Sequence, residues 1–135
     1  MGYNAELVRR AHAAYASGFK DRNPSEVLSL VDPMVEWQEA VSIMEGNYRG
    51  HEGVRRWMEE FWESWDELQL ETLEVIEGEA NRVFATVRIK GRGKASGAPV
   101  GGQVYEVIEV RDRLMVKRLV FPDRETALEA AGLTT

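Results

Sequence analysis

The carboxylate of Glu39, on a short predicted strand, is a side chain of a type that can take a proton from an organic molecule. Glu39 follows Trp37 by two residues, so both side chains share one face of that strand. If this face is buried, Glu39 could act as a general base, because an apolar site raises the pKa of a carboxyl towards neutrality. The alternative interpretation is a solvent-exposed glutamate at the end of the strand.

Arg88 is the second charged side chain in a position of chemical interest. It alternates with Val87 on a longer predicted strand and shares a face with Phe84 and Thr86. If it points inward, its guanidinium would bind a carboxylate or an enolate. If it points outward, it belongs to a basic outer face or a dimer surface, as do Lys90, Arg92, Lys94, Lys117 and Arg118.

The composition narrows the classes of partner. There is no cysteine, and His12 and His51 lie far apart without metal-ligand spacing, so we expect no metal and no cofactor. A net charge of −6 argues against nucleic acid, which needs a surplus of basic side chains. No apolar run is long enough to span a membrane and no secretory signal is visible. Cytoplasm is the default location.

The order of predicted elements favours a single α+β domain over residues 1–135. The first half has helical periodicity at 4–20, 24–31 and 51–65, with a short strand near 35–39. The second half alternates with period two in strands near 68–76, 83–90, 103–110 and 114–121. We expect a step near Thr72, a long loop or irregular hairpin over 91–102, and a last helix capped by Asp123.

The helix at 51–65 has the bulkiest apolar face. Val54, Trp57, Met58, Phe61 and Trp65 recur at helical spacing, and such a stripe needs a large concave cover. The meandering strands supply that cover, as a curved antiparallel sheet that forms a half-open cone against the N-terminal helices. Inside it we predict an apolar pocket with aromatic walls that include Phe19, Trp37, Trp57 and Phe61. Trp62 falls off the stripe and belongs to the pocket mouth or to a subunit contact.

This arrangement resembles the nuclear transport factor 2-like superfamily, in particular its SnoaL-like branch. The resemblance rests on four stretches that join the elements: Asp32–Trp37, Tyr48–Val54, Arg88–Gly97 and Phe121–Leu133. It implies a conical pocket and a homodimer formed through the sheet. Members include isomerases, cyclases, epoxide hydrolases, dehydratases and subunits without chemistry, so the fold does not select the function.

The resemblance also implies roles for individual residues. Steroid isomerases of this superfamily place a basic carboxylate where this chain has Trp37, which leaves Glu39 as a displaced base. They aim a helix tyrosine and a strand acid at the substrate oxygen, and the matching positions are Tyr15 and either Gln103 or Tyr105. These side chains could donate hydrogen bonds to a carbonyl oxygen. Alternatively, the two tyrosines simply fill the core.

Two other mechanisms of the superfamily fit less well. SnoaL-type cyclases use an acid and a histidine in the pocket, but neither His12 nor His51 lies on a late strand. Epoxide hydrolases need two aspartates around an arginine. Arg88 and Arg118 could point inward, yet no aspartate lies on the flanking strands.

Three functions therefore remain open. The first is binding of a small, largely apolar molecule without chemistry, with Arg88 and Gln103 as polar contacts. The second is an isomerase or cyclase that uses Tyr15, Glu39 and Tyr105. The third is a dimerisation module whose cone is filled by its own side chains.

Overall fold

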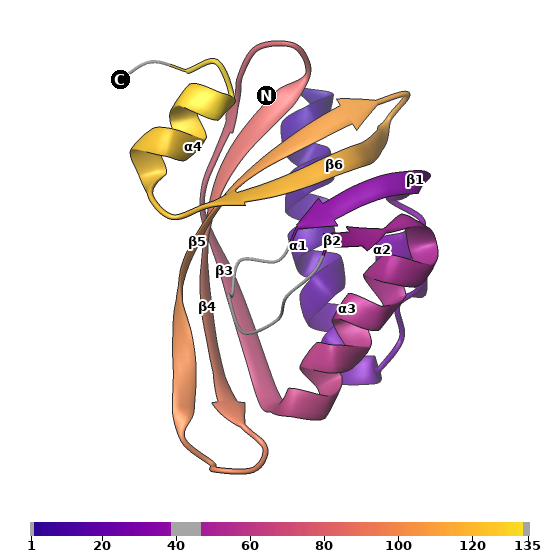
Figure 1. Cartoon of the computed structure of the whole chain (residues 1–135), viewed down its shortest axis with the longest axis vertical. Coiled ribbons are helices and arrows are strands. Elements are labelled where there is room, and N and C mark those ends of the chain that lie inside the picture. The colour runs from indigo at the N-terminus through magenta and orange to yellow at the C-terminus, as the bar shows by residue number, and fades with distance from the viewer. Residues whose placement is uncertain (1, 39–46, 134–135) are drawn as a thin grey trace.

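The computed structural model describes residues 2–38 and 47–133 and confirms the α+β class (Figure 1). In chain order the elements are α1 (Tyr3–Asp21), α2 (Ser25–Leu28), β1 (Val31–Gln38), β2 (Asn47–Arg49), α3 (Gly50–Ser64), β3 (Trp65–Glu77), β4 (Arg82–Gly93), β5 (Pro99–Arg111), β6 (Leu114–Phe121) and α4 (Arg124–Ala130). Among the described residues, no helix combines the length and the apolar character that crossing a membrane requires.

The described strands form one curved, unclosed sheet in the order β2-β1-β6-β5-β4-β3. Neighbouring strands are antiparallel except β1 and β6, which run parallel. The four long strands β3 to β6 pair antiparallel as predicted, and β1 joins their edge in parallel. A parallel pair needs a long connection, and most of the chain lies between β1 and β6.

The two faces of the sheet are covered by different helices. On β4, Val83 and Ala85 face inward and join the main core with residues of α1 and α3. Phe84 between them faces outward and packs with Val107 under α4. Side chains alternate along a strand, so the opposite orientations of Ala85 and Phe84 show which residues of β4 face the main core and which face α4.

Three predicted boundaries differ from the structure. The second helix ends at Leu28, because Val31 begins β1 and pairs with Met115 of β6. Trp65 begins β3 and is not the last turn of the aromatic helix. The predicted irregular hairpin is mostly strand, since β4 continues to Gly93 and β5 starts at Pro99. In each case backbone pairing extends a strand further than its side-chain pattern indicates.

The step predicted near Thr72 is confirmed as a register shift between β3 and β4. Thr72 pairs with Val87, and the next pair joins Glu74 to Thr86, so β3 has one additional residue there. Such a bulge bends the strand locally. Beside it, the Thr72 hydroxyl lies 2.8 Å from Nδ1 of His12 on α1.

Asp123 caps α4 as the sequence predicts. The Asp123 carboxylate accepts a hydrogen bond of 2.8 Å from the Thr126 amide. Asp123→Ala is therefore expected to lower the free energy of unfolding by about 1 kcal/mol. Urea denaturation against Glu63→Ala, an exposed change on α3, tests this. Equal midpoints for the two variants would contradict the cap.

Candidate functional site

A cavity of about 750 Å³ lies between the inner face of the long strands and the helices α1 and α3. Its volume is within the range of about 300–1,000 Å³ that is typical of small-molecule sites. The wall is mainly apolar, and six aromatic side chains contribute to it: Tyr15, Phe19, Trp57, Phe61, Trp62 and Trp65. The polar and charged side chains include His12, Tyr15, Glu106 and Arg118.

The aromatic wall is built by rings that contact one another edge to face. The ring centroids of Tyr15 and Trp57 are 5.7 Å apart, those of Trp57 and Phe61 5.1 Å, and those of Phe61 and Trp65 5.4 Å. Tilted contacts of this kind are the preferred arrangement of aromatic pairs. Helical spacing on α3 supplies Trp57 and Phe61, so the amphipathic pattern of this helix positions the wall directly.

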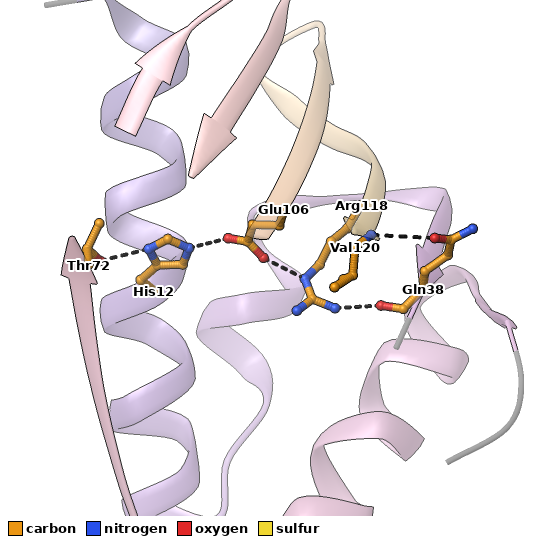
Figure 2. A network of polar contacts seen from close by, with 6 residues as sticks. All are labelled: His12, Gln38, Thr72, Glu106, Arg118 and Val120. Carbon is orange, nitrogen blue, oxygen red and sulfur yellow. Dashed lines mark hydrogen bonds and ion pairs between the residues drawn. The ribbon is translucent and has the colours of Figure 1, made fainter. Parts of the chain in front are cut away.

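A buried polar network forms the floor of the cavity (Figure 2). Nε2 of His12 lies 2.5 Å from one carboxylate oxygen of Glu106, and Nε of Arg118 donates to the other at 2.8 Å. Nδ1 of His12 contacts the Thr72 hydroxyl, so both ring nitrogens are occupied. His12, Glu106 and Arg118 are at most 5% exposed. A buried charge must be paired in this way, because an isolated one would be too costly to desolvate.

Arg118 is held from several directions at once. One of its terminal nitrogens donates to the backbone oxygen of Gln38 on β1 at 2.5 Å. Its guanidinium carbon lies 5.1 Å from the ring centroid of Trp37 and 5.2 Å from that of Trp57. Aromatic faces attract a cation at this range. Arg118 therefore ties β5, β1 and the aromatic wall together at the floor of the cavity.

The carboxylate of Glu106 is a poor general base in this setting. Burial alone would raise its pKa, but the adjacent His12 and Arg118 outweigh burial and hold the pKa at about 2. A base that works near neutral pH needs a pKa close to the pH at which it acts. The geometry makes Glu106 a fixed negative charge that orients its two cationic or hydrogen-bonding partners.

Tyr15 offers a hydrogen-bond donor to the cavity. Its side chain is 7% exposed, and burial is the main reason that its pKa is raised well above the ordinary value, with the Glu106 charge adding to the effect and Arg118 opposing it. The phenol therefore stays protonated at any ordinary pH. Within residues 2–38 and 47–133 its hydroxyl makes no hydrogen bond, so it can donate to a molecule in the cavity.

Several of the residues singled out in the sequence lie together at the cavity. Tyr15, Phe19, Trp57 and Phe61 all line it. Trp37 does not line it: this side chain is fully buried, with its ring centroid 5.9 Å from that of Tyr15 and 5.2 Å from that of Trp57. Trp37 thus supports the wall from behind. Trp62, expected at a mouth or a contact, is buried and lines the cavity.

Two predicted site residues lie on the other face of the sheet. Arg88 points outward and forms an ion pair of 3.1 Å with Glu71 of β3. Tyr105 also points outward, where it packs near α4 and donates its hydroxyl to Oε1 of Gln103 at 3.0 Å. Gln103 borders the cavity, but its side-chain oxygen is engaged by Tyr105. The inward alternative for Arg88 and the placement of Tyr105 in the site are therefore wrong, because both side chains lie on the face of β4 and β5 opposite the cavity.

Glu39, the predicted base, lies outside the described residues. In contrast, the buried acid that the structure does place at the cavity, Glu106, was not singled out. Its signal was present in the sequence: Glu106 stands between Val104 and Ile108 on the apolar face of an alternating strand. A charged residue on a core-facing register position indicates a buried partner. The sequence also held a signal for His12, because His12 lies three residues before Tyr15 and therefore on the same helix face.

The described residues contain no group of three or more His, Asp or Glu side chains that could hold a metal ion. The described side chains offer hydrogen-bond donors and charges at one end of the cavity and an apolar wall along the rest. Such an arrangement can orient an apolar molecule through one polar oxygen.

Comparison with known proteins identifies the fold. Residues 9–118 match the model of the SnoaL-like domain family. No match was found among curated proteins.

Solved structures of the same architecture support this match. An NTF2-like protein of unknown function from Burkholderia pseudomallei aligns with a TM-score of 0.76 at 19% identity, over 96% of this chain and 97% of the other. TerC co-crystallised with polyporic acid aligns with a TM-score of 0.73 at 22% identity, over 95% and 97%. A Catenulispora acidiphila protein with a ketosteroid isomerase-like fold, in complex with trimethylamine, gives 0.71 at 13%, over 91% and 92%. At these identities the likeness concerns the fold alone.

Proposed function

This chain belongs to the SnoaL-like domain family, and from the cavity of this particular member we propose that it binds a small, largely apolar organic molecule carrying a carbonyl-type oxygen. The observation that carries the proposal is the Tyr15 hydroxyl, a protonated donor at the cavity that makes no hydrogen bond within the described residues. A ligand oxygen would satisfy this donor, and the aromatic wall would bury the rest of the molecule.

The neighbouring structures are consistent with this proposal. TerC was co-crystallised with polyporic acid, and the Catenulispora acidiphila protein was solved with trimethylamine. Both are small organic molecules held by proteins of this fold. The fold itself hosts unrelated activities. The proposal therefore rests on Tyr15 and the aromatic wall of this chain, and the neighbouring structures only agree with it.

Binding is better supported than proton abstraction. An isomerase or cyclase of the expected type would use Glu39 as base and Tyr15 with Tyr105 or Gln103 as donors, but Tyr105 points away from the cavity and engages the side-chain oxygen of Gln103. Glu106 is paired with His12 and Arg118, and its low pKa makes it a weak proton acceptor. The dimerisation module with a filled cone is the least supported reading, because the cavity has room for a ligand.

Acetylnaphthalene and ethylnaphthalene provide a direct test, since they differ mainly in the carbonyl oxygen. We expect the protein to prefer acetylnaphthalene by roughly fivefold, because one neutral hydrogen bond contributes about 1 kcal/mol. Tyr15→Phe should remove this preference and leave the affinity for ethylnaphthalene unchanged. Isothermal titration calorimetry measures both constants. Binding of neither compound would refute the proposed function, and an unchanged preference in Tyr15→Phe would remove Tyr15 from it.

The homodimer implied by the family resemblance is a second part of the proposal. The outer face of β3 and β4 carries cross-strand ion pairs, among them Arg88 with Glu71 and Arg92 with Glu67. A dimer formed through so charged a face should weaken as salt rises, because salt screens exposed charges. We expect dimers in sedimentation velocity at micromolar concentration that dissociate at high salt. A monomer at low salt would rule out this interface.

A further inference from the structure

Gly91 of β4 and Gly102 of β5 lie on the inner face of the sheet, and the space above these two glycines differs. A Cβ atom built on Gly91 of β4 would lie 2.3 Å from the backbone oxygen of Glu67 and 2.4 Å from the ring of Trp65, so these atoms already fill the place of a side chain. A Cβ atom built on Gly102 of β5 would have no described atom within 4 Å. The wall is therefore complete at Gly91 and lacks a side chain at Gly102.

The backbone does not explain why position 102 is a glycine. Gly102 lies inside β5 and is not among the described glycines with positive φ, so its conformation is open to any residue. The neighbouring Gly101 is different, because a Cβ atom there would approach the backbone oxygen of Ile89 to 2.3 Å. A glycine in a strand weakens it and often marks a place where a ligand approaches the backbone closely.

The register of the sheet shows what a side chain at position 102 would meet. Gly102 pairs with Ile89, which in turn pairs with Leu70. On the inner face these three residues are neighbours, and Gly102 is the one without a side chain. Both Ile89 and Leu70 line the cavity, as does Gly102 itself. An apolar part of a ligand placed here would contact Leu70 and Ile89 and lie against the backbone of β5.

The distance between position 102 and the polar floor follows from the geometry of β5. Glu106, Val104 and Gly102 occupy successive inward positions of β5 and line the cavity. Four residues of extended strand span about 13 Å. A molecule whose oxygen meets Tyr15 near Glu106 must therefore be long to reach Gly102, whereas a compact one ends before it.

We propose that Gly102 sets the length of the ligand, by leaving room at the far end of the cavity for the apolar tail of an elongated molecule whose oxygen binds at the floor. The ligand class is thus an aryl or fused-ring carbonyl compound with an apolar extension, and compact carbonyl compounds fill only the floor half. This inference rests on the proposed function, because it assigns the second half of the same cavity.

Two ketones with the same head test this division of the cavity. Acetophenone carries only the carbonyl and one ring, and para-hexylacetophenone adds an apolar tail opposite the carbonyl. Gly102→Leu should weaken the binding of para-hexylacetophenone at least tenfold, because the leucine side chain takes the space of the tail. The affinity for acetophenone should change less than twofold. Quenching of tryptophan fluorescence reports binding, since Trp57, Trp62 and Trp65 line the cavity.

A matched control separates the cavity from the strand pairing. Lys90→Leu adds the same side chain to the outer face of the same hairpin and should leave both affinities unchanged. If Gly102→Leu fails to fold, Gly102→Ala should give a smaller loss, of about threefold, for the long ketone only. Equal losses for both ketones, or no loss for either, would overturn the inference while the wild-type protein still binds. Absence of binding by the wild-type protein would instead refute the proposed function.

Discussion

Replacing Glu106 with glutamine is expected to lower the free energy of unfolding by about 3–5 kcal/mol at neutral pH. The substitution keeps the size of the side chain but removes the negative charge between His12 and Arg118, which are 4% and 5% exposed. Arg118 would then lose its buried ion pair with Glu106. Chemical denaturation followed by tryptophan fluorescence measures the loss.

The exposed pair of Glu71 and Arg88 provides the matched control. Its ion pair of 3.1 Å is comparable in length, but the Glu71 side chain is 64% exposed. Glu71→Gln should therefore cost less than about 1 kcal/mol, as is usual for a surface pair. Similar losses for Glu106→Gln and Glu71→Gln would show that the buried network has no special importance for stability.

The pH dependence of the same comparison has a definite sign. The pKa of Glu106 in the folded protein is about 2, below the ordinary value of 4.5. The ionised carboxylate therefore stabilises the fold fully above about pH 4.5, and this contribution is lost as the pH falls towards 2. The stability difference between the wild-type protein and Glu106→Gln should narrow across this window. A constant difference from pH 7 to pH 2 would contradict the assignment.

Trp57→Ala is expected to have an effect of similar size, about 3–5 kcal/mol, because it empties a buried aromatic position. Trp57 is 6% exposed, and its ring contacts those of Tyr15, Trp37 and Phe61 with centroid separations of 5.1–5.7 Å. It also lies under the guanidinium of Arg118. Removing it should loosen both the wall and the floor of the cavity, so ligand affinity should fall as well.

Urea denaturation of Trp57→Ala against Tyr3→Ala checks this prediction. Tyr3 is an aromatic residue of α1 that is 42% exposed, and its loss should change the free energy of unfolding by less than about 1 kcal/mol. A midpoint for Trp57→Ala that equals the wild-type value would mean that this ring is not part of a packed core.

Local patterns predicted the elements well where one face of an element is buried. The aromatic stripe of 51–65 became α3, the alternation of 83–90 became part of β4, and the step near Thr72 is a bulge. Each of these signals depends only on a period along the chain, which a single sequence displays. Strand ends were less well predicted, because pairing partners extended β4 and β5 through residues with weak patterns of their own.

The face of the sheet that lines the cavity could not be read from the alternation of β4 and β5. Two sets of side chains alternate on these strands, and both include buried residues, since α4 covers one face and α1 and α3 cover the other. An apolar residue on the outer face, such as Phe84, is as buried as one on the inner face. This is why the orientation of Arg88 stayed open, Tyr105 was assigned to the cavity and Glu106 was overlooked.

The sequence by itself determined the α+β class, the family resemblance and the aromatic wall, because periodic spacing positions Trp57 and Phe61 on one side of a helix without help from distant residues. Only the tertiary structure decided the polar floor. His12 and Glu106 are 94 residues apart, and Arg118 is 12 residues beyond Glu106. Such a cluster is specified by three-dimensional packing that brings α1, β5 and β6 together, and no spacing along the chain encodes it. The cavity thus has a wall that local patterns predict and a floor that only the folded chain assembles.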